Sequence, residues 1–184
     1  MARADIAPVP AGTPFLVVGE ALIDLVPDGD GSTFDSPWQA QTAGGPLNTA
    51  VALARLGRTV DFGAPLARDA FGRQMLAHLD ANGVGRDRRP SGEGATALAV
   101  VSLDEHGKAS YHFHRHGTAT FDFRADRMPK PREGEWLHVA SLVLVVEPGA
   151  DELLAWVRGT DAPLSIDVNV RTIVEPDPVA YWRR

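Results

Sequence analysis

Short apolar runs alternate along this chain with amphipathic segments of helical spacing. Residues 15–19 (FLVVG) form an apolar run that ends at a glycine, which predicts a buried strand. Residues 47–57 (LNTAVALARLG) place alanine and leucine at helical intervals before Gly57, a typical helix stop. Further strands are expected at 60–66, 136–141 and 163–168, and further helices at 69–83 and 148–159. This order predicts a layered α/β domain with a mostly parallel sheet.

One segment does not fit the alternation. Residues 96–103 (TALAVVSL) and 109–115 (ASYHFHR) are extended runs on either side of the polar turn DEHGK, which predicts a hairpin. We expect this hairpin to form a separate small sheet, which residues 34–42 join. The apolar run at 140–146 is expected to be a buried strand or its edge, and it is too short to span a bilayer.

Composition narrows the classes of partner. The 184 residues carry a formal net charge of -6, and a net acidic surface repels nucleic acid. The chain has no cysteine, which excludes disulfides, thiolate metal sites and a cysteine nucleophile. We therefore expect a cytoplasmic protein with neither a nucleic-acid nor a membrane partner. Residues 1–14, with their prolines and small residues, are expected to be a flexible tail.

A glycine pair opens the first predicted helix, in the stretch TAGGPLN. Ligands of open α/β sheets bind beyond the carboxyl ends of the strands, where this pair and the residues after the first strand, Glu20 and Asp24, are expected. Glycine allows a ligand close to the backbone, Asp24 offers acceptors, and Asn48 offers donors and an acceptor. This combination suits a hydroxyl-rich ligand such as a sugar. Alternatively, Gly44 and Gly45 merely form a tight turn and Asn48 caps the helix.

Five stretches taken together resemble a known family. In chain order they are VVGEALIDL, AGGPLNTAVALARLG, DAFG, TALAVVSLDEHGKASYHFHRHGTA and DVNVR. They resemble the ribokinase-like (PfkB) carbohydrate kinases, and the fructokinases most of all. Gly44, Gly45, Asn48 and Gly57 match the family signature, whereas Ala67 stands in place of a later glycine and the run GGPLN is shorter than usual.

The resemblance implies a three-layer α/β/α, Rossmann-like ribokinase fold with a small β lid. Residues 15–184 would form its N-terminal, sugar-binding part, with lid strands at about 33–42 and 96–123. The C-terminal nucleotide-binding part is expected to be absent, so that the fold is incomplete in this chain.

The resemblance also implies roles for particular residues. The substrate-binding residues would be Asp24, Gly44, Gly45, Asn48, Arg115 and Glu147. Arg115 matches a lid arginine whose aromatic companion is Phe113. Asp167, Asn169 and Arg171 match a D-x-N-x-R strand end near the transferred phosphate, where a fixed cation offsets negative charge.

Each of these assignments has a structural alternative. Asp24 could begin a turn, Arg115 could be a solvated strand charge, and Arg171 could pair with Asp167. The three histidines of the hairpin lie at i, i+2 and i+4, a spacing that can bind a metal, but an exposed lid strand also explains them. They are His112, His114 and His116, and we predict no metal site.

The motif that carries the catalytic base in this family is missing from the sequence. The family uses an aspartate in a later G-A-G-D motif, and neither that motif nor N-x-x-E occurs here. No catalytic residue is therefore predicted, and ATP and Mg²⁺ are implied by the family alone. The first hypothesis is the sugar-binding part of an ATP-dependent, fructokinase-like carbohydrate kinase.

Two other hypotheses stay open at this point. The chain could be a catalytically inactive module that binds a sugar or a partner, or a structural fragment without a function of its own. The expected ligand is fructose or a similar sugar, because related kinases for ribose, nucleosides and keto-deoxy acids share most of these residues. A homodimer through the lid is a further expectation.

Overall fold

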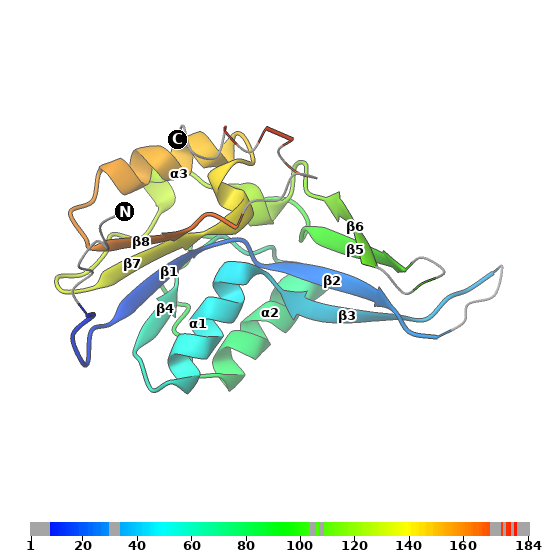
Figure 1. The fold of residues 1–184 in the computed structure, drawn as a ribbon, viewed down its shortest axis with the longest axis horizontal. Coiled ribbons are helices and arrows are strands. Elements are labelled where there is room, and N and C mark those ends of the chain that lie inside the picture. The colour runs from blue at the N-terminus through cyan, green and yellow to red at the C-terminus, as the bar shows by residue number, and fades with distance from the viewer. Residues whose placement is uncertain are drawn as a thin grey trace.

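The computed structural model describes residues 8–29, 34–103, 106, 109–169, 174, 176–177 and 179 of the chain. Within these residues the chain forms two four-stranded sheets, three α-helices and short 3-10 segments (Figure 1). A flexible tail was predicted at residues 1–14, and residues 1–7 of it lie outside the described residues.

The main sheet consists of four parallel strands in the order β4-β1-β7-β8. Its strands are β1 (Phe15–Gly19), β4 (Val60–Phe62), β7 (Trp136–Ala140) and β8 (Leu164–Asp167). Helices α1 (Gly45–Arg55) and α2 (Ala70–Ala81) lie on one side of this sheet, and α3 (Gly149–Arg158) lies on the other (Figure 1). The three-layer α/β arrangement predicted from the sequence is confirmed. Because the strands are parallel, their carboxyl ends meet at a single edge.

Local capping explains where the helices begin and end. Asp69 precedes α2, and its Oδ1 accepts a hydrogen bond of 2.8 Å from the N–H of Gly72. The same carboxylate accepts the N–H of Thr96 at 2.8 Å, so it also ties α2 to the segment before the hairpin. Burial raises the pKa of Asp69, but the hydrogen bonds from Gly72 and Thr96 outweigh burial and the net shift is downward. Helix α1 ends before Gly57, whose φ of 77° is the left-handed conformation expected of a helix stop.

The second sheet, here called the lid sheet, has the order β3-β2-β5-β6. Its strands are β2 (Leu22–Pro27), β3 (Trp38–Ala43), β5 (Leu98–Leu103) and β6 (Ala109–His114). The hairpin and strand β3 were predicted, whereas β2, which lies between them, was not. Strand β2 starts only two residues after β1 and pairs parallel with β5, so the lid sheet continues directly from the centre of the main sheet.

Two predicted strands are corrected by the structure. Residues 140–146 do not form a strand of their own. Ala140 is the last residue of β7, and Ser141–Leu144 form a 3-10 turn, η3. The φ of Ser141 is 75°, which turns the chain out of the sheet, and the N–H of Leu142 bonds to Glu20 instead of to a neighbouring strand. The strand predicted at 60–66 ends at Phe62, and Leu66 forms an isolated bridge with Ser91.

The core is continuous across the layers and reaches into the lid sheet. Residues Leu16, Val17 and Val18 of β1 have no exposed surface. Other large, fully buried side chains are Phe62, Ile23, Leu47, Met75, Leu79, Phe123, Leu137 and Leu153. Burial of each such side chain stabilises the fold by about 1.5–3 kcal/mol. None of the helices within the described residues is long and apolar enough to cross a membrane.

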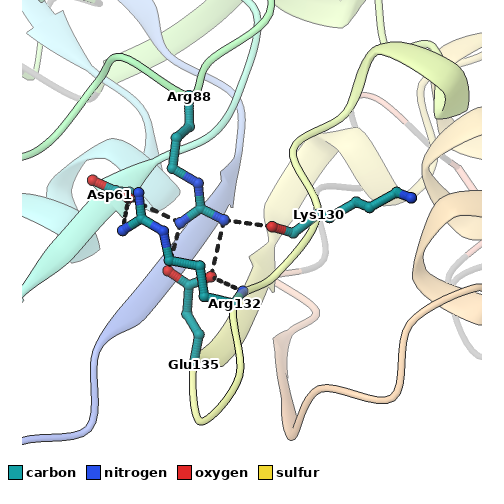
Figure 2. Close-up of polar contacts among 5 residues, drawn as sticks. All are labelled: Asp61, Arg88, Lys130, Arg132 and Glu135. Carbon is teal, nitrogen blue, oxygen red and sulfur yellow. Dashed lines mark hydrogen bonds and ion pairs between the residues drawn. The ribbon is translucent and has the colours of Figure 1, made fainter.

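A network of ion pairs joins β4, the loop after α2 and the start of β7 (Figure 2). Arg88 donates from Nη1 to Asp61 Oδ2 at 2.9 Å and to Glu135 Oε1 at 2.6 Å. Its Nη2 donates to Glu135 Oε2 at 3.0 Å and to the carbonyl oxygen of Lys130 at 2.5 Å. The Glu135 side chain is 1% exposed and also accepts the N–H of Arg132 at 2.8 Å. Arg88 therefore compensates the buried charge of Glu135.

Candidate functional site

A cavity of about 550 Å³ opens at the carboxyl ends of the main-sheet strands, between this edge and the lid sheet. Of the residues predicted for the site, Asp24, Gly44, Gly45, Asn48 and Asn169 line it. They come from β2, the start of α1 and the segment after β8, which are far apart in the sequence. The fold thus brings an acidic side chain, two carboxamides and bare backbone to one hollow.

Asp24 lies on the face of the lid sheet that looks into this cavity. Its register partner on β5 is Ala99, whose own partner on β6 is Phe113, so the three residues share one face. Asp24 and Phe113 both line the cavity. Burial raises the pKa of the Asp24 carboxyl above its ordinary value of 3.8.

Two aromatic rings of β6 form part of the cavity wall. Tyr111 and Phe113 stack with their ring centroids 6.3 Å apart and their planes 18° apart. Because side chains alternate along a strand, His112 and His114 project from the opposite face of the lid sheet. No group of three or more histidine, aspartate or glutamate side chains within the described residues is placed to hold a metal ion.

The two glycines at the start of α1 differ in what the fold requires of them. Gly44 has a φ of 121°, and a Cβ there would lie 2.4 Å from the carbonyl oxygen of Glu20, so only glycine fits. A Cβ on Gly45 would meet Asn169 and Ser141 at 3.7 Å, which is ordinary contact. Packing within the chain therefore does not require glycine at position 45. Because Gly45 has no side chain, its backbone is open to the cavity.

Asn48 does not cap the helix. The N-cap of α1 is Gly44, which lies four residues earlier, and no side chain makes a capping hydrogen bond there. Asn48 is a helical residue of the first turn, its side chain is exposed, and it lines the cavity. The interpretation of Asn48 as a simple cap is therefore wrong, whereas its role towards a ligand stays a prediction.

Two non-glycine residues at the floor of the cavity have left-handed backbone conformations. Ser141 has a φ of 75° and Asn169 a φ of 37°, and Asn169 Nδ2 donates to Ser141 Oγ at 2.9 Å. Such conformations cost about 1–3 kcal/mol each and concentrate at functional sites. Both residues line the cavity.

Glu20 also lines the cavity; the sequence placed it at this edge of the sheet but assigned it no role. Only 3% of its surface is exposed, and its Oε2 accepts the N–H of Leu142 at 3.1 Å. Burial raises the pKa of Glu20 from 4.5 to about 7, against hydrogen bonds from Ser141, Val143 and Leu142 that lower it. A carboxylate directly after a buried apolar strand is the sequence signal that could have identified it.

The remaining predicted residues lie elsewhere. Arg115 and Glu147 line a second cavity, of about 410 Å³, and not the cavity of Asp24. Asp167 is exposed at the end of β8, where its Oδ1 accepts the N–H of Asn169 at 3.2 Å. Arg171 lies outside the described residues.

A larger cavity, of about 660 Å³, contains none of the predicted residues. It lies between residues 130–135, which precede β7, and the end of α3. Its charged lining is mixed, with Lys130 and Arg132 beside Asp126 and Asp161. Because it adjoins the amino ends of β7 and β8, it is not where an open α/β sheet binds its ligand.

Known proteins share both the sequence pattern and this architecture. The profile of the family described as "pfkB family carbohydrate kinase" matches residues 13–179. A fructokinase of Klebsiella pneumoniae is 32% identical over 166 residues, which are 88% of this chain and 52% of that protein. The chain spans about half the length of the curated relatives it matches.

Solved structures show the same fold over nearly the whole chain. The crystal structure of fructokinase from Xylella fastidiosa matches with a TM-score of 0.78 and 28% identity, over 92% of this chain and 55% of that one. Fructokinase from Vibrio cholerae O395, in its form with bound fructose, ADP and calcium ion, matches with a TM-score of 0.73 and 29% identity. That match covers 95% of this chain and 56% of the other.

Proposed function

Because this chain belongs to the pfkB family of carbohydrate kinases, we propose that it provides the sugar-binding part of a fructokinase-like enzyme. Such an enzyme transfers a phosphoryl group from ATP to a sugar hydroxyl. One observation carries the proposal: Asp24, the glycine pair and Asn48 line one cavity although they come from different elements. The similarity to a fructokinase with bound fructose supports fructose, or a sugar like it, as the ligand.

The cavity offers complementary groups for a polyol. The Asp24 carboxylate accepts hydrogen bonds from sugar hydroxyls, and the carboxamide of Asn48 both donates and accepts. No side chain caps the start of α1, and Gly45 leaves room for the sugar to approach the backbone N–H groups there, which donate to hydroxyl oxygens. The stacked rings of Tyr111 and Phe113 present an apolar surface to the C–H face of the sugar.

ATP and Mg²⁺ enter the proposal through the family and not through a site found in this chain. The described residues contain no group of three metal-ligating side chains, and the sequence contains no G-A-G-D motif. We infer that the catalytic base and the nucleotide site are absent from these 184 residues. Asp167, Asn169 and Arg171 are proposed to lie near the transferred phosphate, and ATP with Mg²⁺ would supply the phosphoryl group there.

The test of the sugar site is calorimetry of the folded chain with fructose, ribose and 2-keto-3-deoxygluconate. We expect fructose to bind, and Asp24→Ala to weaken its binding about 10- to 100-fold, because a hydrogen bond to a charged group contributes about 1.5–3 kcal/mol. The matched control is Asp28→Ala, an exposed aspartate just beyond β2, which should leave the affinity unchanged. A folded wild-type chain that binds none of the three sugars would overturn the proposal.

We further propose that two copies of the chain pair through their lid sheets. Strands β3 and β6 are the edges of this sheet, and Trp38 and Tyr111 on them are 43% and 41% exposed. Sedimentation should then show a dimer that Trp38→Ser weakens. The matched control is Leu56→Ser, at an exposed leucine directly after the end of α1 and outside the lid sheet, which should leave the dimer unchanged. A wild-type chain that stays monomeric up to its solubility limit contradicts this pairing.

A further inference from the structure

A chain of hydrogen bonds crosses the floor of the cavity and ends at Glu20. Asn169 Nδ2 donates to Ser141 Oγ at 2.9 Å, and the Ser141 hydroxyl in turn bonds to the Glu20 carboxylate. The three residues follow β8, β7 and β1, so the chain links the carboxyl ends of three neighbouring strands. All three line the cavity.

The direction of this chain depends on whether Glu20 carries a proton. A serine hydroxyl has one proton to donate, and an ionised carboxylate can only accept. With Glu20 ionised, Ser141 donates to Glu20 and has only lone pairs left for Asn169. The amide of Asn169 must then turn its NH₂ group to Ser141, which leaves its oxygen free for the cavity.

Protonation reverses every bond in the chain. A neutral Glu20, having taken a proton from water, donates its O–H to Ser141 Oγ. The Ser141 hydroxyl is then free to donate to the amide oxygen of Asn169, which turns that oxygen away from the cavity. The group presented to a ligand changes from an acceptor to a donor.

We propose that Glu20 is a positioning residue of the sugar cavity, whose charge sets the orientation of the Asn169 amide and hence the hydrogen bond offered to a ligand hydroxyl. The use of a sugar as ligand rests on the function proposed above. The strained backbone of Ser141 and Asn169 fits this role, because the hydrogen bonds to Glu20 and between the two residues hold both conformations in place.

Burial raises the pKa of Glu20 to about 7, so its change of charge can be followed in experiments near neutral pH. The turn η3 and the first turn of α1, which pack around it, contain no titratable side chain. The titratable groups that line the cavity on other elements are Asp24 on β2 and Tyr111 on β6. The neighbouring strands of the main sheet add His138 on β7 and Asp167 at the end of β8. Arg171 lies outside the described residues.

The first test measures fructose affinity by calorimetry between pH 6 and 8.5. We expect the affinity of the wild-type chain to change about tenfold across this range, which is the effect of one hydrogen bond made or lost. Glu20→Gln mimics the neutral acid, so its affinity should equal the low-pH value and stay constant with pH. The matched control is the exposed glutamate variant Glu133→Gln, which should keep the wild-type pH profile. A Glu20→Gln variant with that same profile would refute the role of Glu20.

The second test needs no sugar, so it separates this inference from the proposed function. In an NMR titration of the wild-type chain, the side-chain amide signals of Asn169 should shift with the same midpoint as the Glu20 carboxyl carbon. In Ser141→Ala, which removes the intermediate hydroxyl, the Asn169 signals should no longer follow Glu20. If the Asn169 signals of the wild-type chain do not respond between pH 6 and 8.5, the inference fails even if fructose binds. If they respond and no sugar binds, the hydrogen-bond chain stands and the sugar assignment fails.

Discussion

Arg88→Met is expected to lower the free energy of unfolding by about 3–5 kcal/mol, because it leaves a buried carboxylate without its counter-charge. Glu135 is 1% exposed and receives two of its hydrogen bonds from the Arg88 guanidinium. Methionine fills a similar volume, so the loss reports the missing charge and not a cavity. Urea denaturation followed by tryptophan fluorescence measures the change, and the four tryptophans of the chain supply the signal.

The matched control is Arg132→Met, the same substitution at the rim of the same network. The Arg132 side chain is 63% exposed, and its Nη1 approaches Asp61 Oδ2 at 3.3 Å (Figure 2). An exposed ion pair contributes about 0–1 kcal/mol, so this variant should be nearly as stable as the wild-type chain. Equal losses in the two variants would mean that the burial of Glu135 is not what makes Arg88 important.

Stability is expected to fall by roughly 3 kcal/mol on account of Glu20 as the pH rises from about 4.5 to above 7. The pKa of Glu20 is raised from 4.5 to about 7 by burial, so in this range the folded state holds a proton that the unfolded state has released. The stabilising contribution of Glu20 to the free energy of unfolding is therefore fully present below pH 4.5 and is lost as the pH rises through about 7. At about 1.4 kcal/mol per pKa unit, the difference between the two values corresponds to roughly 3 kcal/mol.

The measurement is the difference in unfolding free energy between the wild-type chain and Glu20→Gln at several pH values. The comparison of the two proteins is needed because other groups titrate in the same pH range and also change the stability. Burial lowers the pKa of His138 below its ordinary value of 6.5. The contribution of His138 to the free energy of unfolding therefore increases as the pH rises towards 6.5, which opposes the effect of Glu20. Because His138 is present in both proteins, its contribution cancels. The difference between the two proteins should change with pH by roughly the amount given above, and a difference that is constant with pH rules out a buried, neutral Glu20.

The two effects of Glu20 point in opposite directions and together indicate a functional residue. Above pH 7 the ionised carboxylate costs stability, yet in the proposed cavity it is the ionised form that turns the oxygen of Asn169 towards a ligand. Residues that lower stability while they organise a site are typical of binding and catalytic centres. A carboxylate with a structural role alone would not link unfolding and ligand affinity to the same titration.

Elements that depend on neighbouring residues could be predicted from the sequence. The capping of α2 by Asp69, the end of α1 before Gly57 and the hairpin of β5 and β6 follow from residues a few positions apart. The approach of Asp24 to the glycine pair was also predictable, because parallel strands place the segments that follow them at one edge of the sheet. The assignment to the carbohydrate kinases rests on the same stretches.

Features that depend on distant contacts could not be predicted. The apolar run at 140–146 has the composition of a strand, but Leu142 finds its hydrogen-bond partner in Glu20, which is 122 positions away. In the charge network, Arg88 bonds to Glu135, which is 47 positions away in the sequence. Arg115 and Glu147 line a second cavity, and the sequence pattern did not reveal this. It did not reveal β2 either, through which the lid sheet continues from the main sheet.

The sequence by itself therefore determined most of the strands and helices, the cap of α2 and the stop of α1, and the residue types available at the carboxyl edge of the main sheet. These properties follow from backbone preferences and from periodic burial, which act over a few residues. Only the tertiary structure decided which carboxylates are buried, which donors they meet and which residues share a cavity. The reason is physical: desolvation and hydrogen bonding depend on the whole surroundings of a group, and packing assembles those surroundings from segments far apart in the chain.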